Sequence, residues 1–266
     1  MPLLSTDLQD GEDMTLTVAS YGGGTDSTAM LIESANRGEK IDLILFADTG
    51  GEKPHTYKYV RDFSKWLVKH GMPAIQRVQT TDINGTYITL EQVCRNMNQL
   101  PSLAYGMKSC SDKHKIRPQN KYLNNWQPAK DAWARGEKVT KLVGYDADED
   151  HRIKDYTDEK YSVRYPLVEW GMGRDECVAA IQAAGLELPG KSACFFCPSS
   201  RPQEIRQLAR EYPELAERAL RMEAAADLTT CKGLGRNFAW RDLLAQNDMF
   251  DENVVTPELT CGCYDG

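Results

Sequence analysis

The run Ser20–Ser27, with the sequence Ser-Tyr-Gly-Gly-Gly-Thr-Asp-Ser, has the residue types of an anion-binding loop. Alternating apolar residues precede it from Met14 onwards, which predicts a strand, and apolar residues at helical spacing follow it as far as Gly38, which predicts a helix. A glycine-rich turn between a parallel strand and a helix directs unpaired backbone N–H groups and the positive end of the helix dipole toward one point. We therefore expect phosphate to bind there.

The side chains of this loop have separate expected parts. Its three glycines let the backbone approach phosphate oxygens closely, and Ser20 and Ser27 add hydroxyl donors. Asp26 positions a metal ion or, like Thr25, caps the following helix. The loop lacks the Lys-Ser ending of a Walker P-loop and the second half of a Gly-x-Gly-x-x-Gly fingerprint, so it is a different kind of phosphate loop. The alternative is a glycine turn that only links a strand to a helix.

Three cysteines have the spacing of ligands that share one centre. Cys194 and Cys197 form a Cys-x-x-Cys-Pro turn, and Cys110 lies far upstream. A tight turn presents both of its sulfurs to one metal, and soft thiolates select an iron–sulfur cluster or zinc, which spacing alone does not separate. The alternatives are a pair of buried, reduced thiols or a redox-active pair. Cys177, on an apolar helical stripe, is expected in the core.

Further strands and helices are expected around this loop. A continuous apolar run over 41–46 predicts a buried parallel strand, and Asp48 follows it. Helical spacing then predicts a helix whose apolar face includes Val68, and strands are expected at 75–78 and 139–143. Alternating strands and helices predict a doubly wound parallel sheet, in which ligands bind beyond the carboxyl ends of the strands.

After the sheet the pattern becomes helical and bears cysteines. Helices are expected from apolar residues around Cys177, from Ile205 and from Pro213 onwards. An earlier helix is expected just before Pro101, with Met97 on its apolar face. We divide the chain into a flexible leader at 1–13, a nucleotide-binding α/β domain at 14–165, a helical subdomain at 166–250 and a tail at 251–266.

The overall composition is that of an ordinary folded protein. Hydrophobic residues make up 41% of the 266 residues and charged residues 27%, which argues against a disordered or fibrous chain. We find neither an apolar run of about 18 residues nor a secretory signal, so a cytoplasmic protein with no membrane partner is expected. Because the net charge is −7, nucleic acid would have to bind a local basic patch. Such a patch is present at Lys108, Lys113, Lys115, Arg117 and Lys121.

Several segments resemble a known superfamily. Residues 20–27 resemble the Ser-Gly-Gly-x-Asp-Ser signature of the PP-loop ATP pyrophosphatases, the adenine nucleotide α-hydrolase superfamily, and residues 46–50 resemble phosphoadenosine phosphosulfate (PAPS) reductases. The loop Gly144–Arg152 is similar to a loop of that group, although Asp146 stands where an arginine is usual. Segments 165–167 and 192–198 resemble reductase-like proteins often carried by phages. The resemblance spans about residues 15 to 225.

The resemblance also bears on the cysteines. Adenylylsulfate reductases hold a four-iron cluster with a Cys-Cys pair and a distant Cys-x-x-Cys, and here Ser109 stands in place of the first cysteine. It therefore implies three protein ligands and leaves a fourth position for sulfide, substrate or another side chain. Cys261 and Cys263 are candidates for that position. Alternatively, Cys261 is a mobile nucleophile similar to the cysteine in the terminal Glu-Cys-Gly motif of the reductases.

The resemblance implies an enzyme that binds ATP with Mg²⁺, adenylates an acceptor with release of pyrophosphate, and then transfers sulfur with the help of a [4Fe–4S] cluster. Zinc is the alternative to the cluster. Two rival functions are a sulfonucleotide reductase that uses Cys261 and a nucleotide-binding sensor subunit without chemistry. The acceptor, nucleic acid or small molecule, stays open, as does assembly into a homo-oligomer.

The expected site residues follow from these matches. The basic group near Lys113 would stabilise charge that develops at the α-phosphate. The catalytic candidates are Asp26, Ser27, Lys113, Arg152 and Cys261. The nucleotide-binding candidates are Ser20, Gly22, Gly23, Gly24, Thr25, Asp26, Ser27, Asp48, Thr49, Gly144 and Asp148. The metal-ligand candidates are Cys110, Cys194, Cys197 and Cys263.

Overall fold

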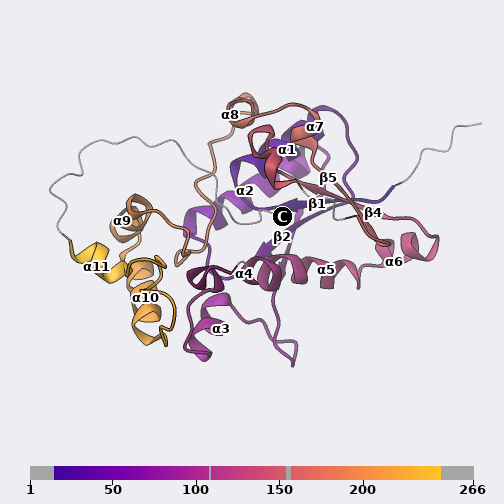
Figure 1. Ribbon diagram of the computed structural model, residues 1–266. Helices are drawn as coiled ribbons and strands as arrows, with labels where there is room; N and C mark the ends of the chain where they lie inside the picture. Colours follow the sequence, from indigo (N-terminus) through magenta and orange to yellow (C-terminus); the bar gives the residue numbers. More distant parts are fainter. Residues whose placement is uncertain (1–14, 108, 154–156, 247–266) are drawn as a thin grey trace, which may run out of the picture.

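The computed structural model describes residues 15–107, 109–153 and 157–246, and it shows a parallel sheet with helices on both faces (Figure 1). The strand order is β3-β2-β1-β4-β5, and every neighbouring pair is parallel. The predicted doubly wound α/β fold is therefore confirmed. The strands are β1 Thr17–Tyr21, β2 Leu43–Asp48, β3 Ile75–Gln79, β4 Val139–Val143 and β5 Tyr161–Arg164.

The direction of winding changes between β1 and β4. β1 pairs with β2 on one side and with β4 on the other, so that Ser20 faces Leu45 and Val143 in the register. In a doubly wound sheet the crevice for a ligand opens at this position, outside the carboxyl ends of the two strands. The segments that follow β1 and β4, which begin at Gly22 and Gly144, therefore border the crevice.

Four helices cover one face of the sheet (Figure 1). They are α1 Thr25–Asn36, α2 Pro54–Lys69, α7 Pro166–Glu169 and α8 Arg174–Ala183. Met30, Phe63 and Ile181 from three of them join Ile44 and Phe46 of β2 in one buried cluster. Each such fully buried side chain stabilises the fold by about 1.5–3 kcal/mol relative to an exposed one.

The start of α1 differs from the prediction. The N-cap is Gly24, and no side chain caps the helix, whereas Thr25 and Asp26 lie inside the first turn. Both side chains instead form hydrogen bonds with Arg174 of α8. The predicted cap at Thr25 or Asp26 is therefore wrong.

The opposite face is covered by two helices that the sequence patterns did not predict, α5 Arg117–Leu123 and α6 Gln127–Ala134 (Figure 1). Leu123 and Ala129 pack there against Val18 and Leu45 of the sheet. Because the buried residues of α6 are alanines, its sequence carries little apolar periodicity.

A second hydrophobic cluster lies beside the sheet and includes Phe196, Ile205 and Trp240. The helices after residue 166 therefore divide between two cores, since α7 and α8 pack on the sheet whereas the later helices pack with α3. This second group consists of α3 Leu90–Asn96, α9 Pro202–Glu211, α10 Pro213–Ala225 and α11 Trp240–Ala245. The short turns are η1 Ser102–Tyr105, α4 Ser109–Ser111, the π-helical η2 Asp112–Ile116 and η3 Ala147–Arg152.

Other boundaries and faces differ in detail from the predictions. β2 begins and ends two residues later than the apolar run suggested, and β5 was not predicted. Val68 and Met97 were expected on apolar helix faces, yet they are 55% and 61% exposed. Met97 follows the end of α3. No helix in the described part of the chain is long and apolar enough to span a membrane.

Candidate active site

The glycine loop between β1 and α1 folds back on the first turn of the helix. Gly23 has φ +79°, a left-handed conformation that favours glycine. The Ser27 hydroxyl accepts a hydrogen bond from the Gly22 N–H at 3.2 Å and donates to the Gly24 carbonyl at 3.3 Å. Ser27 thus closes the loop over the helix start, where the first N–H groups of α1 have no partners within the helix. Such an arrangement binds anions.

Gly144, the residue after β4, lies directly against this loop. A Cβ added at Gly144 would be 2.8 Å from the Cα and 2.9 Å from the N of Ser27, and 3.2 Å from the carbonyl carbon of Asp26. All three neighbours are backbone atoms, which cannot rotate away as a side chain can. Only glycine therefore allows the two segments at the switch point to come this close.

Asp26 pairs with Arg174, a residue that the sequence analysis did not select. The Asp26 Oδ1 lies 2.7 Å from Arg174 Nη1, and Arg174 Nη2 donates to the Thr25 hydroxyl at 3.0 Å. The Arg174 backbone N–H donates in turn to Asp148 Oδ2 at 2.9 Å. Arg174 thus brings a cation from the start of α8 to the glycine loop. Asp148, a predicted nucleotide contact, bonds to the backbone of Arg174 and lies behind it as seen from the loop. The sequence signal was an arginine in an otherwise acidic first helical turn.

Asp48, at the end of β2, is fully buried and has both oxygens engaged. Oδ1 accepts from the Tyr57 hydroxyl at 2.7 Å and from the Gly50 N–H at 2.8 Å. Oδ2 accepts from Gln79 at 3.0 Å and forms an ion pair with Arg77. Burial, followed by the hydrogen bond and the charge of Asp48, raises the pKa of Tyr57. Asp48 therefore fixes the turn after β2, and its expected contact with nucleotide stays a prediction.

Ser20, another expected nucleotide contact, faces the other side of the sheet. Its hydroxyl is 3% exposed and donates to Gln119 Oε1 of α5 at 2.8 Å. This bond anchors α5 under the end of β1. The hydroxyl is thus engaged in the fold, and a role toward phosphate stays a prediction.

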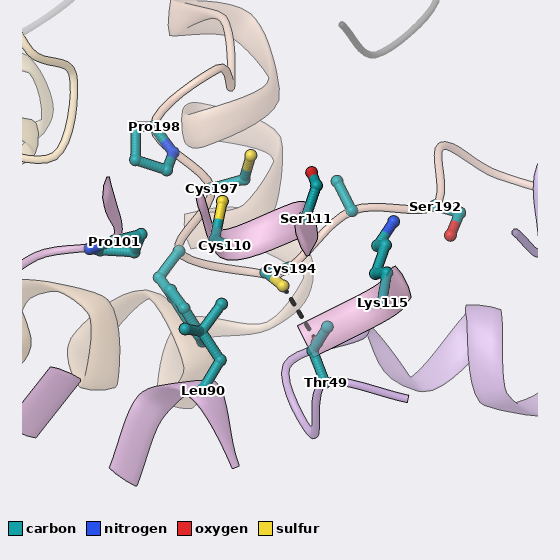
Figure 2. A pocket seen from close by; sticks show the side chains of 12 residues that line it. Thr49, Leu90, Pro101, Cys110, Ser111, Lys115, Ser192, Cys194, Cys197 and Pro198 are labelled. Carbon is teal, nitrogen blue, oxygen red and sulfur yellow. Dashed lines mark hydrogen bonds between the residues drawn. The ribbon is translucent and has the colours of Figure 1, made fainter. Parts of the chain in front are cut away.

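The three cysteines predicted as ligands line a single pocket (Figure 2). Cys194 and Cys197 form a tight turn in which the Cys197 N–H donates to the Cys194 carbonyl at 2.9 Å. Cys110 reaches the same pocket from α4. None of the three forms a disulfide with another residue in the described ranges. The other lining residues are Thr49, Leu90, Pro101, Ser111, Lys115, Ser192, Ala193, Phe196 and Pro198.

The turn that carries Cys194 is fastened to the loop after β2. Glu52 and Cys194 form an antiparallel bridge, and the Phe195 N–H donates to the Gly51 carbonyl at 2.7 Å. A Cβ at Gly51 would be 2.9 Å from the ring of Phe196, so this contact also depends on a glycine. The position of the cysteine turn is therefore set by the end of the sheet.

Two thiols of the pocket, those of Cys194 and Cys197, have hydroxyl partners. Cys194 Sγ lies 3.1 Å from the Thr49 hydroxyl, the dashed line in Figure 2, and Cys197 Sγ lies 3.0 Å from the Ser199 hydroxyl. Among the described residues, no three His, Cys, Asp or Glu side chains are arranged to hold a metal ion. The donor set of three thiols suits a soft metal centre, and binding through Cys194 would exchange its contact with Thr49 for a metal bond. Cys261 and Cys263 lie outside the described residues.

Ser192 joins the cysteine pocket to the glycine loop. The residue is 5% exposed, and its hydroxyl donates to the Gly22 carbonyl at 2.6 Å and lies 3.4 Å from Glu52 Oε2. The same side chain lines the cysteine pocket. The loop and the pocket therefore share a wall, although they were predicted from separate motifs.

The basic residues near Cys110 do not all face the pocket. Lys115 lines it, whereas the predicted catalytic residue Lys113 is exposed and is not among the lining residues. Both lie in the π-helical turn η2. His114 between them is buried 3.0 Å from the Thr80 hydroxyl, and burial, with a smaller effect of Lys113, lowers the pKa of His114 to about 4. Lys108 lies outside the described residues.

Arg152, another catalytic candidate, is held within the loop after β4. Its guanidinium lies 2.5 Å from Glu149 Oε2 and stacks over the Tyr145 ring at 4.2 Å from the centroid. Burial, followed by the charges of Glu149 and Asp148, raises the pKa of the nearby Asp146. These contacts organise the acidic loop, and a catalytic role for Arg152 stays a prediction.

Two known proteins illustrate what this chain is similar to. The uncharacterized nin region protein ORF290 of Escherichia phage lambda is 28% identical over 209 residues, which are 71% of this chain and 68% of that protein. The U34-tRNA thiolase NcsA from Methanococcus maripaludis with its [4Fe-4S] cluster matches at a TM-score of 0.41 and 15% identity, over 86% of this chain and 78% of that one. No family model matches the chain. At these levels neither likeness assigns an activity to this chain.

Proposed function

We propose that this chain binds ATP at the β1–α1 loop, cleaves it to AMP and pyrophosphate, and so adenylates an acceptor beside a metal centre on Cys110, Cys194 and Cys197. This would make it a PP-loop ATP pyrophosphatase of the PAPS reductase-like group that its motifs resemble. The observation that carries the proposal is the position of Ser192. Its hydroxyl bonds to the Gly22 carbonyl while the residue lines the cysteine pocket, which supports a single site made of the loop and the pocket.

The loop supplies groups for the nucleotide part of the reaction. An acceptor oxygen would attack the α-phosphorus with its electron pair, the bond to the bridging oxygen would break, and pyrophosphate would leave with that bond's electrons. Backbone N–H groups at the start of α1 would offset the charge on the phosphates, as would the Arg174 guanidinium, which is 25% exposed and lies beside Asp26. Mg²⁺ bound with the nucleotide would offset it further.

The pocket supplies groups for the second part. A [4Fe–4S] cluster would provide a site for sulfur next to the adenylated acceptor, and zinc is the alternative that the same thiols would hold. What supports this part of the proposal is that Cys110, Cys194 and Cys197 line one pocket, which Lys115 also lines.

The first experiment is anaerobic purification followed by measurement of iron, acid-labile sulfide and zinc per chain. ATP labelled at the α-phosphate is then followed for AMP release, with pyrophosphate measured in parallel. Ser27→Ala should lower AMP formation by about ten-fold or more, since it opens the loop. Ser34→Ala, a buried serine on the same helix, is the matched control and should leave the rate unchanged.

Each outcome decides a separate part of the proposal. Stoichiometric zinc without sulfide would overturn the cluster and leave ATP cleavage standing. Tight ATP binding with no AMP from any acceptor would overturn the enzyme and favour a sensor subunit. Equal rates for Ser27→Ala and Ser34→Ala would show that the glycine loop is not the nucleotide site.

A further inference from the structure

A second hollow lies on the sheet edge, between β3 and α5. We call it the β3–α5 groove, and its volume is about 510 Å³, which is within the usual range for ligand sites. None of the described residues that line it lines the cysteine pocket as well. Its lining residues are Arg77, Val78, Gln79, Thr81, Pro118, Lys121, Tyr122, Asn125, Trp126 and Gln127.

The groove presents cationic side chains on a chain whose net charge is −7. Arg77 and Lys121 contribute to the lining, and among the described lining residues none is acidic. Lys121 Nζ donates to the Thr81 hydroxyl at 2.7 Å, which holds the ammonium over the groove. Asp48, which pairs with Arg77, is fully buried behind it. Because Asp48 offsets much of the charge of Arg77, Lys121 is the main cation that an anionic ligand meets among the described lining residues.

The lining also includes aromatic rings and side-chain amides. Trp126 and Tyr122 pack against the sheet with one side and are only partly buried. The side-chain amides of Gln79, Asn125 and Gln127 each donate one hydrogen bond within the fold, to Asp48, the Lys121 carbonyl and Asp131 respectively. A side-chain amide also has a second N–H and a carbonyl oxygen with which it can bond to a ligand. Unpaired bases stack on aromatic side chains and pair their edges with amides, and their phosphates attract lysine and arginine. The groove combines all three kinds of group.

We propose that the β3–α5 groove binds a single-stranded segment of nucleic acid, with a base on Trp126 and a phosphate at Lys121. β3 is an edge strand, so a peptide strand could also pair there, but the rings, amides and cations favour nucleic acid over a peptide. Duplex is disfavoured because its bases are not free to stack on a protein ring.

The groove adjoins the crevice through two side chains. Arg77 and Gln79 line the groove, and both also bond to Asp48 at the carboxyl end of β2. The next residue, Thr49, lines the cysteine pocket. A nucleic-acid segment in the groove would therefore pass close to the proposed site of adenylation. The inference that this nucleic-acid segment is the acceptor rests on the proposed function. The inference that the groove binds such a segment does not.

The test is fluorescence anisotropy with end-labelled oligothymidylate and oligouridylate of about ten nucleotides, titrated at several salt concentrations. Lys121→Gln should weaken binding and reduce the slope of log affinity against log salt by about 0.7, the value for one phosphate contact on a single strand. Lys69→Gln, on α2 across the sheet, is the matched control and should change neither quantity. A duplex of the same length should bind more weakly than either single strand.

Trp126 tests the stacking contact. Trp126→Ala should weaken binding about five-fold or more, the loss of one stacked base, and Trp126→Phe should retain most of it. If Trp126→Ala does not fold, Gln127→Ala and Lys121→Gln carry the test. Ser27→Ala should bind oligonucleotide like the wild type, so failure of ATP cleavage and failure of the groove are distinguishable.

Three results would overturn the proposal. The first is no oligonucleotide binding at low salt, and the second is equal salt slopes for Lys121→Gln and Lys69→Gln. The third is displacement of bound label by unstructured peptide but not by unlabelled oligonucleotide, which would assign the groove to a protein strand.

Discussion

Replacing Gly144 with alanine tests whether the position of the glycine loop determines nucleotide binding. The added Cβ would lie 2.8 Å from the Cα and 2.9 Å from the N of Ser27, whereas ordinary contact begins at 3.4 Å. Both neighbours are main-chain atoms, so the loop or the end of β4 must move by several tenths of an ångström. Overpacking of this kind costs about 1–3 kcal/mol of stability.

The same displacement should weaken nucleotide binding. Hydrogen bonds from backbone N–H groups are confined to about 2.7–3.2 Å, so a shift of this size lengthens those at the first turn of α1. Loss of one or two such bonds to a charged phosphate, at about 1.5–3 kcal/mol each, predicts an affinity at least ten-fold lower. Isothermal titration with a non-hydrolysable ATP analogue measures the affinity, and urea denaturation measures the stability.

Gly136→Ala is the matched control. Gly136 follows α6, has φ +78° and has nothing within 4 Å of an added Cβ, so alanine there costs about 1–2 kcal/mol through backbone conformation alone. It should reduce stability by a similar amount and leave nucleotide affinity unchanged. If Gly144→Ala lowers stability as expected but binds the analogue like the wild type, the loop is not where the phosphates bind.

Three other predictions concern single groups. In a double-mutant cycle of Arg174→Gln and Asp26→Asn, urea denaturation should give a coupling energy of about 1–3 kcal/mol, because the pair is mostly buried; additive effects would contradict it. Cys110→Ala should lower bound metal several-fold, as measured by elemental analysis, whereas Cys231→Ala, outside the pocket, should not. Burial lowers the pKa of His114 to about 4 in the folded chain, whereas the same side chain takes up a proton near pH 6.5 in the unfolded chain. The contribution of His114 to stability is therefore present above pH 6.5 and lost as the pH falls to 4. The stability of the wild type relative to His114→Gln should therefore fall by about 2 kcal/mol between pH 7 and pH 4.5 in urea titrations, and a constant difference would refute this.

The central strands and the glycine loop were predictable because their signals are local. β4 has the predicted bounds, and β2 differs by only two residues, since a central parallel strand is a continuous apolar run. β5 lies at the edge of the sheet, where only Tyr161 is buried, and it therefore lacks that run. α6 buries only alanines, which give no contrast between faces.

The site residues were likewise predictable only where their sequence signal is local. Convergence of the cysteines was expected from a short motif and a resemblance, and the three do line one pocket. Arg174 and Ser192 were missed because their partners lie about 150 and 170 residues away in the sequence. Lys115 rather than Lys113 reaches the pocket because residues two positions apart on one helical turn point to nearly opposite sides.

The shared wall also limits how strongly the two parts of the crevice can influence each other. A ligand that orders the glycine loop acts on the cysteine pocket through the Ser192 hydroxyl and the Gly22 carbonyl, which are both buried. One such hydrogen bond contributes about 1 kcal/mol net, which corresponds to roughly a five-fold change in affinity. Because linkage is reciprocal, a metal centre in the pocket would alter nucleotide affinity by the same factor. Coupling much larger than this would require movement of the whole cysteine turn, which the bridge between Glu52 and Cys194 resists.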